Sequence, residues 1–125
     1  MYIPPGFNTV TPYFFVEGAE NFVSFLVNGL GGTETCRTMR PNGLIANVQV
    51  QIGTSTVMVS EATEKCKSMA AAYYLYVEDA HASMRRALEH GPTRDGGWRH
   101  ALRGQTGRSE RPQRQYLVDL ATHRS

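Results

Sequence analysis

Apolar and polar residues alternate through the middle of the chain with the period of two that is typical of β-strands. In "LIANVQVQI" (44–52), every second residue from Leu44 is apolar, and the positions between them are mostly amides such as Asn47 and Gln49. A strand with this period presents one apolar and one mostly polar face. "RPNG" before it is a hairpin turn, and Gly53-Thr54-Ser55 after it leads into a second strand, "TVMVSEA".

Two other stretches carry the periodicity of a helix. In "AENFVSFLVNGLGG" (19–32), large apolar residues recur at intervals of three and four, and the glycine pair ends the helix. In "DAHASMRRALEHG" (79–91), Asp79 is the expected N-cap, and Met84 and Leu88 share one apolar face. Aromatic and β-branched residues predict further strands in "TVTPYFFVEG", "TETCRTM" and "AAAYYLYVED".

The chain repeats itself at an offset of 61 residues. Val16-Glu17-Gly18-Ala19 falls on Val77-Glu78-Asp79-Ala80, and each copy joins an aromatic strand to an amphipathic helix. The first copy continues with three strands, so the repeated unit is β-α-β-β-β. Two such units of roughly 60 residues would use the whole chain.

These stretches, in this order, resemble the glyoxalase/bleomycin-resistance (vicinal-oxygen-chelate) superfamily, in particular a glyoxalase-like bacterial branch. The resemblance covers residues 1 to about 92 and rests on "TPYFFVEGAENFVSFLVNGLGG", "RPNGLIANVQVQIGTSTVMVSEA" and "YLYVEDAHASMRRALEHG". It implies an α+β fold of paired βαβββ modules within a single domain over 1–125, with modules at 8–62 and 71–125. It also implies a homodimer and a small-molecule cavity enclosed by curved sheets.

The tail departs from this pattern in its charge. Residues 94–125 carry seven arginines against three acidic residues, a net +4, whereas residues 1–93 carry six basic and eight acidic residues, a net −2. Such a split ordinarily indicates a basic arm that binds a polyanion. The resembled family instead has three more strands after Gly91, and the written tail lacks their usual motifs.

Reading the tail one nucleotide out of frame restores those motifs. With permitted codons, residues 99–120 yield "GMPYGDRQGGVKDPSGNIWWIS", which contains the family's Y-G-D-R and D-P-x-G-N signatures in order. We infer as a hypothesis that the second module is authentic only to about 92, after a frameshift near 91–94. The arginines then need no selection for phosphate contacts, and no specific nucleic-acid partner is expected. Sequencing the gene tests this hypothesis.

Catalytic members of the resembled family hold a divalent metal with His, Gln or Glu side chains from both modules. The matching positions here are Thr11, Ala72, the stretch 58–61 and a last strand that the altered tail removes. Alanine cannot bind a metal and threonine is a poor ligand for zinc, nickel or iron, which leaves Glu61 as the single candidate. The matching positions therefore supply no complete metal site, and no other cofactor is expected.

A ligand cavity is expected on one face of the predicted strands. Aromatic walls with a few amides suit a small, partly apolar ligand. Alternatively, the same side chains belong to an interface or to the edge of the core. The predicted cavity residues are Thr11, Tyr13, Phe15, Asn47, Gln49, Met58, Tyr74 and Tyr76.

Composition narrows the class of protein. The chain is 41% apolar and 19% charged, as in ordinary globular domains, and no apolar run approaches the ~20 residues of a membrane helix. The N-terminus lacks a signal-peptide pattern, and Cys36 and Cys66 lack metal or disulfide spacing, so we expect a cytoplasmic protein that does not bind membranes. Three functions stay open: small-molecule binding or sequestration, metal-dependent lyase or dioxygenase chemistry, and a non-functional frameshifted product.

Overall fold

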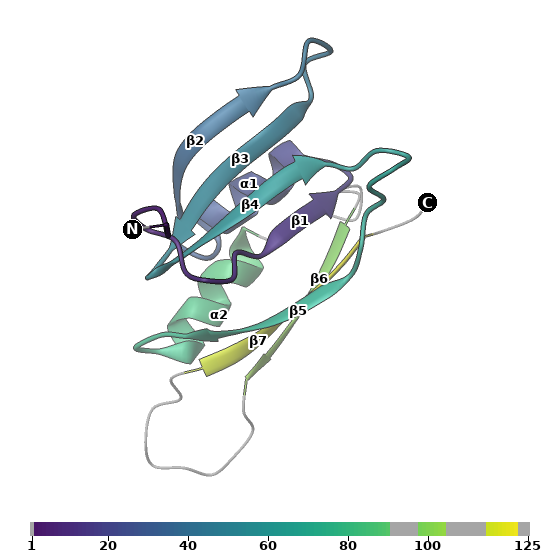
Figure 1. Cartoon of the computed structure of the whole chain (residues 1–125). Coiled ribbons are helices and arrows are strands. Elements are labelled where there is room, and N and C mark those ends of the chain that lie inside the picture. Colours follow the sequence, from purple (N-terminus) through teal and green to yellow (C-terminus); the bar gives the residue numbers. More distant parts are fainter. Residues whose placement is uncertain (1, 91–97, 105–114, 123–125) are drawn as a thin grey trace.

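The structure is a computed structural model (Figure 1), which describes residues 2–90, 98–104 and 115–122. In the last two ranges, it describes the backbone and the side chain of Val118. The elements in chain order are β1 (Tyr13–Val16), α1 (Ala19–Asn28), β2 (Thr33–Met39), β3 (Ile45–Ile52), β4 (Ser55–Glu61), β5 (Ala71–Tyr76), α2 (Ala80–Glu89), β6 (Trp98–Gly104) and β7 (Gln115–Thr122).

The first half forms a four-stranded mixed sheet with the order β1-β4-β3-β2. β1 runs parallel to β4, while β3 pairs antiparallel with both β4 and β2. The helix α1 lies behind this sheet in Figure 1. This half therefore has the predicted element order β-α-β-β-β, and the predicted "TETCRTM" strand is confirmed as β2.

Alternation along the strands separates the two faces of this sheet. Val48 and Val50 on β3 and Val59 on β4 are fully buried on the face that α1 covers. From α1, Phe22 and Phe25 complete this core, and the rings of Phe22 and Phe14 lie 5.0 Å apart. Burial of each large apolar side chain stabilises the fold by about 1.5–3 kcal/mol.

The predicted alternation is wrong at the start of β3. Leu44 was expected on the apolar face, but it is 44% exposed, whereas Ile45 is 2% exposed. The register between β2 and β3 shifts between Thr38 and Met39, so that Met39 pairs with Ile45. An irregularity of this kind reverses which side chain faces the core, and the alternation resumes at Val48.

The second half forms a separate three-stranded antiparallel sheet with the order β5-β7-β6. The predicted N-cap of α2 is confirmed, since the Asp79 carboxylate accepts a hydrogen bond from the backbone N–H of Ala82 at 3.2 Å. The predicted apolar face of α2 is only partly correct. Met84 packs against the core, but Leu88 is 62% exposed. The small Ala80 and Ala87 side chains are the buried ones.

The tail supplies two strands to this second sheet. One of them is β7, whose sequence "QYLVDLAT" contains aromatic and β-branched residues that favour a strand. The other is β6, which pairs with β7 from Trp98–Thr122 to Gly104–Tyr116. Over the described residues, the second half thus reads β-α-β-β, one strand fewer than the first. The hypothesis of a frameshift concerns the gene and stays a prediction.

Contacts near β1 and β5 join the two halves. The backbone N–H of Met69 donates to the carbonyl of Phe15 at 3.3 Å, and the rings of Phe14 and Tyr73 lie 5.2 Å apart. The helices are linked as well, because Arg86 Nε donates to the carbonyl of Asn28 at 2.7 Å. Among the described residues, no helix has the length and apolar character needed to span a membrane.

Candidate functional site

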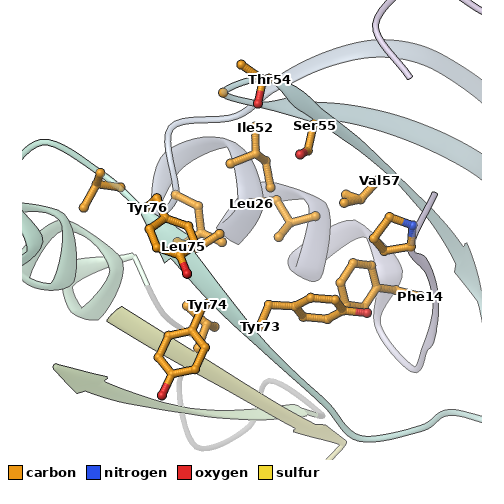
Figure 2. A pocket seen from close by; sticks show the side chains of 15 residues that line it. Phe14, Leu26, Ile52, Thr54, Ser55, Val57, Tyr73, Tyr74, Leu75 and Tyr76 are labelled. Atoms are coloured by element: carbon orange, nitrogen blue, oxygen red, sulfur yellow. The ribbon is translucent and has the colours of Figure 1, made fainter. Parts of the chain in front are cut away.

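A cavity of about 330 Å³ lies between the two sheets, against α1 (Figure 2). The first half contributes apolar side chains from β1, α1 and β4 and the turn between β3 and β4, and the second half contributes β5 and Val118 of β7. The lining residues are Pro12, Phe14, Leu26, Leu30, Ile52, Gly53, Thr54, Ser55, Val57, Tyr73, Tyr74, Leu75, Tyr76, Val77 and Val118.

One wall of the cavity is aromatic. Phe14 on β1 and Tyr73 on β5 meet edge to face, with their ring planes at 62°. Figure 2 shows the Tyr73 ring directed toward Phe14 from the opposite sheet. Edge-to-face pairs of this kind stabilise by about 0.5–1.5 kcal/mol beyond their buried area. This contact therefore fixes the Tyr73 ring at the side of the cavity.

The opposite wall is aliphatic. Leu26 is 1% exposed and reaches the cavity from α1, while Val57 on β4 is 7% exposed. Ile52 at the end of β3 and Leu30 after α1 are partly buried beside them. These side chains are held by the packing of α1 on the sheet, so the wall exists before any ligand arrives.

Hydroxyl groups supply the polar character of the cavity. Thr54 and Ser55 lie at one end in Figure 2, and Ser55 Oγ accepts a hydrogen bond from Asn8 Nδ2 at 3.5 Å. Burial raises the pKa of the Tyr73 hydroxyl above its ordinary value, because the surroundings disfavour the phenolate. Among the described lining residues there is no Asp, Glu, Lys, Arg or His.

The predicted cavity residues are divided between two places. Tyr74 and Tyr76 do line the cavity, although they are 56% and 77% exposed. The alternation along β5 gives the more buried positions to Tyr73 and Leu75. Neither Tyr73 nor Leu75 was predicted to line a cavity, and Phe14, on the equivalent face of β1, was not predicted either. The 61-residue repeat gave no signal for them, because Phe14 and Leu75 are equivalent in it just as Tyr13 and Tyr74 are.

Five other predicted residues gather on the face of the first sheet that α1 does not cover. The Tyr13 and Phe15 rings stack with their centroids 4.6 Å apart, and Asn47 Nδ2 donates to the Tyr13 hydroxyl at 3.3 Å. Met58 is paired across the sheet with both Tyr13 and Gln49. We call these five residues the open face of the first sheet.

Thr11 and Glu61 flank the open face, at the start of β1 and the end of β4. Thr11 is half-buried just before β1. The Glu61 carboxylate lies at the beginning of α1, where Oε2 accepts from the backbone N–H of Gly18 and Oε1 from that of Ala19, each at 3.0 Å. Both carboxylate oxygens are therefore engaged by the helix terminus.

The residues do not fit a bound divalent metal. Ala72 has no ligand atom, and Glu61, the single candidate, serves as the cap of α1. Within residues 2–90, no group of three His, Cys, Asp or Glu side chains could hold a metal ion. Cys36 and Cys66 are both free and exposed.

A scan of protein-family models, a search of curated proteins and a search of solved structures each find no match to this chain.

Proposed function

We propose that this chain binds a small, mostly apolar molecule in the cavity between its two sheets. The observation that carries the proposal is a cavity of about 330 Å³ whose walls come from both halves of the chain and are largely apolar. Ligand pockets in proteins measure about 300–1,000 Å³ and combine apolar walls with a few polar groups. This cavity lies at the lower end of that range, which favours a small ligand.

The driving force would be the removal of apolar surface from water. Each Å² of buried apolar surface contributes about 25 cal/mol, and an organic molecule of a few rings gains enough to offset its loss of freedom on binding. The core already holds the side chains of Leu26, Val57 and Phe14 in place, so binding costs the protein little side-chain conformational entropy.

The sequence resemblance supports the same kind of function. Residues 1 to about 92 resemble the glyoxalase/bleomycin-resistance superfamily, in which sheets enclose a small-molecule cavity. The proposed site does not lie where the sequence placed the cavity. The expected cavity was on the open face of the first sheet, whereas the proposed site is on the side that α1 covers. The expected homodimer is likewise a proposal, which sedimentation of the purified chain tests. No observation favours metal-dependent lyase or dioxygenase chemistry, because Glu61 caps a helix.

A neutral fluorescent probe tests the proposal. N-phenyl-1-naphthylamine brightens in apolar surroundings, and we expect saturable binding to the wild-type chain. Leu75→Phe adds volume inside the cavity and leaves less room for the probe, so it should weaken probe binding about tenfold or more, which corresponds to about 1.4 kcal/mol or more.

Leu88→Phe makes the same chemical change at a residue that is 62% exposed on α2, outside the cavity lining. This control should bind the probe as the wild type does. Circular dichroism of both variants confirms that each is folded. The proposal is wrong if the wild type does not bind the probe, or if both variants bind it equally well.

A further inference from the structure

We infer that the cavity selects an uncharged molecule bearing one hydrogen-bonding oxygen or nitrogen, which the Tyr73 hydroxyl holds. This inference rests on the proposed function and names the chemical class of its ligand. It depends on two features of the lining: the absence of charged side chains among the described residues and the environment of Tyr73.

The lining offers nothing to balance a charge. Its described polar groups are the hydroxyls of threonine, serine and tyrosine and the backbone at Gly53. Moving an ionised carboxylate or ammonium into such a site removes its hydration without supplying a counter-charge, and that cost is large. A neutral molecule of the same shape avoids this penalty.

The Tyr73 hydroxyl is in a different situation from the other hydroxyls. Tyr73 is half-buried, and its ring is fixed against Phe14. No hydrogen-bond partner for its hydroxyl occurs among the described residues, whereas Ser55 is bonded to Asn8. Burial raises the pKa of this hydroxyl, so it is partly withdrawn from water, and a polar group in that situation costs free energy while it has no partner. A ligand oxygen or nitrogen would supply that partner.

The remaining lining hydroxyls are in contact with solvent. Thr54 is exposed, and Tyr74 and Tyr76 are 56% and 77% exposed, so water satisfies them. The Tyr73 hydroxyl is protonated at neutral pH, as a phenol ordinarily is, and burial raises its pKa further. A protonated phenol both donates and accepts, so Tyr73 can pair with a hydroxyl, a carbonyl or a neutral amine.

Three probes that share one ring system separate these requirements. Naphthalene, 2-naphthol and 2-naphthoate are titrated into the wild-type chain, Tyr73→Phe and Tyr2→Phe by calorimetry at pH 7. Tyr2→Phe is the matched control, since this tyrosine is 92% exposed and removal of its hydroxyl should change nothing. Thermal unfolding of each variant confirms that it is folded.

The naphthol-to-naphthalene affinity ratio measures the hydrogen bond, since the shared ring cancels. We expect Tyr73→Phe to lower that ratio about 2- to 10-fold, which corresponds to a hydrogen bond of about 0.5–1.5 kcal/mol. Naphthalene affinity should not change, and 2-naphthoate should bind the wild type at least about tenfold more weakly than 2-naphthol.

Each contrary outcome has its own meaning. An unchanged ratio in Tyr73→Phe overturns the role of the Tyr73 hydroxyl. Equal binding of 2-naphthoate and 2-naphthol overturns the selection of uncharged ligands. Failure of all three probes to bind the wild type overturns the proposed function itself, and the inference with it.

Discussion

The helix of the first half and the helix of the second half are equally long but pack in different ways. Both contain ten residues, and each begins at the alanine of a V-E-x-A corner. The first, α1, buries five of them, including Phe22 and Phe25. The second, α2, buries only Ala80 and Ala87. Large side chains thus hold α1 to its sheet, whereas α2 lies against the molecule through small ones.

The two helices also begin differently. The N-cap of α1 is Gly18 in the left-handed region at φ 76°, where it has no side chain to offer. Glu61 supplies the missing acceptors from the end of β4. The N-cap of α2 is Asp79, which accepts from its own first turn. One half therefore completes its helix through tertiary structure, and the other does so locally.

The largest effect should come from the core of α1. Phe22→Ala removes a side chain that is 0% exposed and touches Phe14, so we expect a loss of about 3–5 kcal/mol in the free energy of unfolding. Leu88→Ala on α2 should change it by no more than about 0.5 kcal/mol, because Leu88 is 62% exposed. Urea denaturation measures both. Similar losses would contradict the stated difference between the helices.

The caps should have the next largest effect. Glu61→Ala removes two acceptors at α1, and we expect a loss of about 1–2 kcal/mol; Asp79→Ala removes one at α2 and should cost about 1 kcal/mol. Urea denaturation gives both values. Glu61→Gln is the control, since one oxygen acceptor remains and the loss should be smaller. A larger loss from Asp79→Ala than from Glu61→Ala would reverse the comparison.

Two arginine variants compare a contact between the halves with contacts inside the first half. Arg86→Ala removes the 2.7 Å hydrogen bond to the Asn28 carbonyl and should cost about 1 kcal/mol. Arg37→Ala breaks exposed ion pairs with Glu20 and Glu34 inside the first half, and such pairs contribute about 0–1 kcal/mol. Denaturation in high salt separates them, because salt screens the Arg37 pairs more strongly. An Arg86 effect that salt abolishes would mean that charge, rather than this hydrogen bond, joins the helices.

The smallest effect should be a difference between the wild type and Tyr73→Phe in how much stability each loses at high pH. The pKa of Tyr73 is raised in the folded chain by burial, so the unfolded chain loses this proton first as pH rises. Its contribution to stability is complete below about pH 10, the ordinary pKa, and is lost as pH rises through the folded value. Tyr73→Phe should therefore lose less stability than the wild type between pH 8 and pH 11. Equal losses, measured by urea denaturation, would show that burial does not shift this pKa.

Local patterns predicted much of the first half. The "TETCRTM" strand, the amide-bearing strand after the hairpin and the helix that follows Gly18 all occur as expected. These elements depend on short-range periodicity, which a single sequence displays. The Asp79 cap was predictable for the same reason, since a cap acts within one turn.

The errors arise where distant parts of the chain decide the outcome. Leu44 and Ile45 exchange places because of how β2 pairs with β3, which their own sequence does not reveal. Leu88 is exposed because nothing among the described residues packs on that side of α2. To predict that Tyr73 and Phe14 line the cavity, one must know which faces of the two sheets pack against each other. Glu61 was considered as a metal ligand because the sequence does not show that its carboxylate lies beside Gly18, a contact that only the tertiary structure creates.

The Glu61 cap has a consequence for the order in which the chain acquires structure during synthesis. The carboxylate lies 43 residues beyond the Gly18 amide that it binds. As the chain emerges from the ribosome, α1 appears long before its acceptor does, and only the completed β4 brings the two together. A short helix with an incomplete terminus is marginal in water. We therefore expect α1 to become stably helical only after residue 61 has been synthesised. The cap of α2, Asp79, directly precedes its helix and is synthesised just before it.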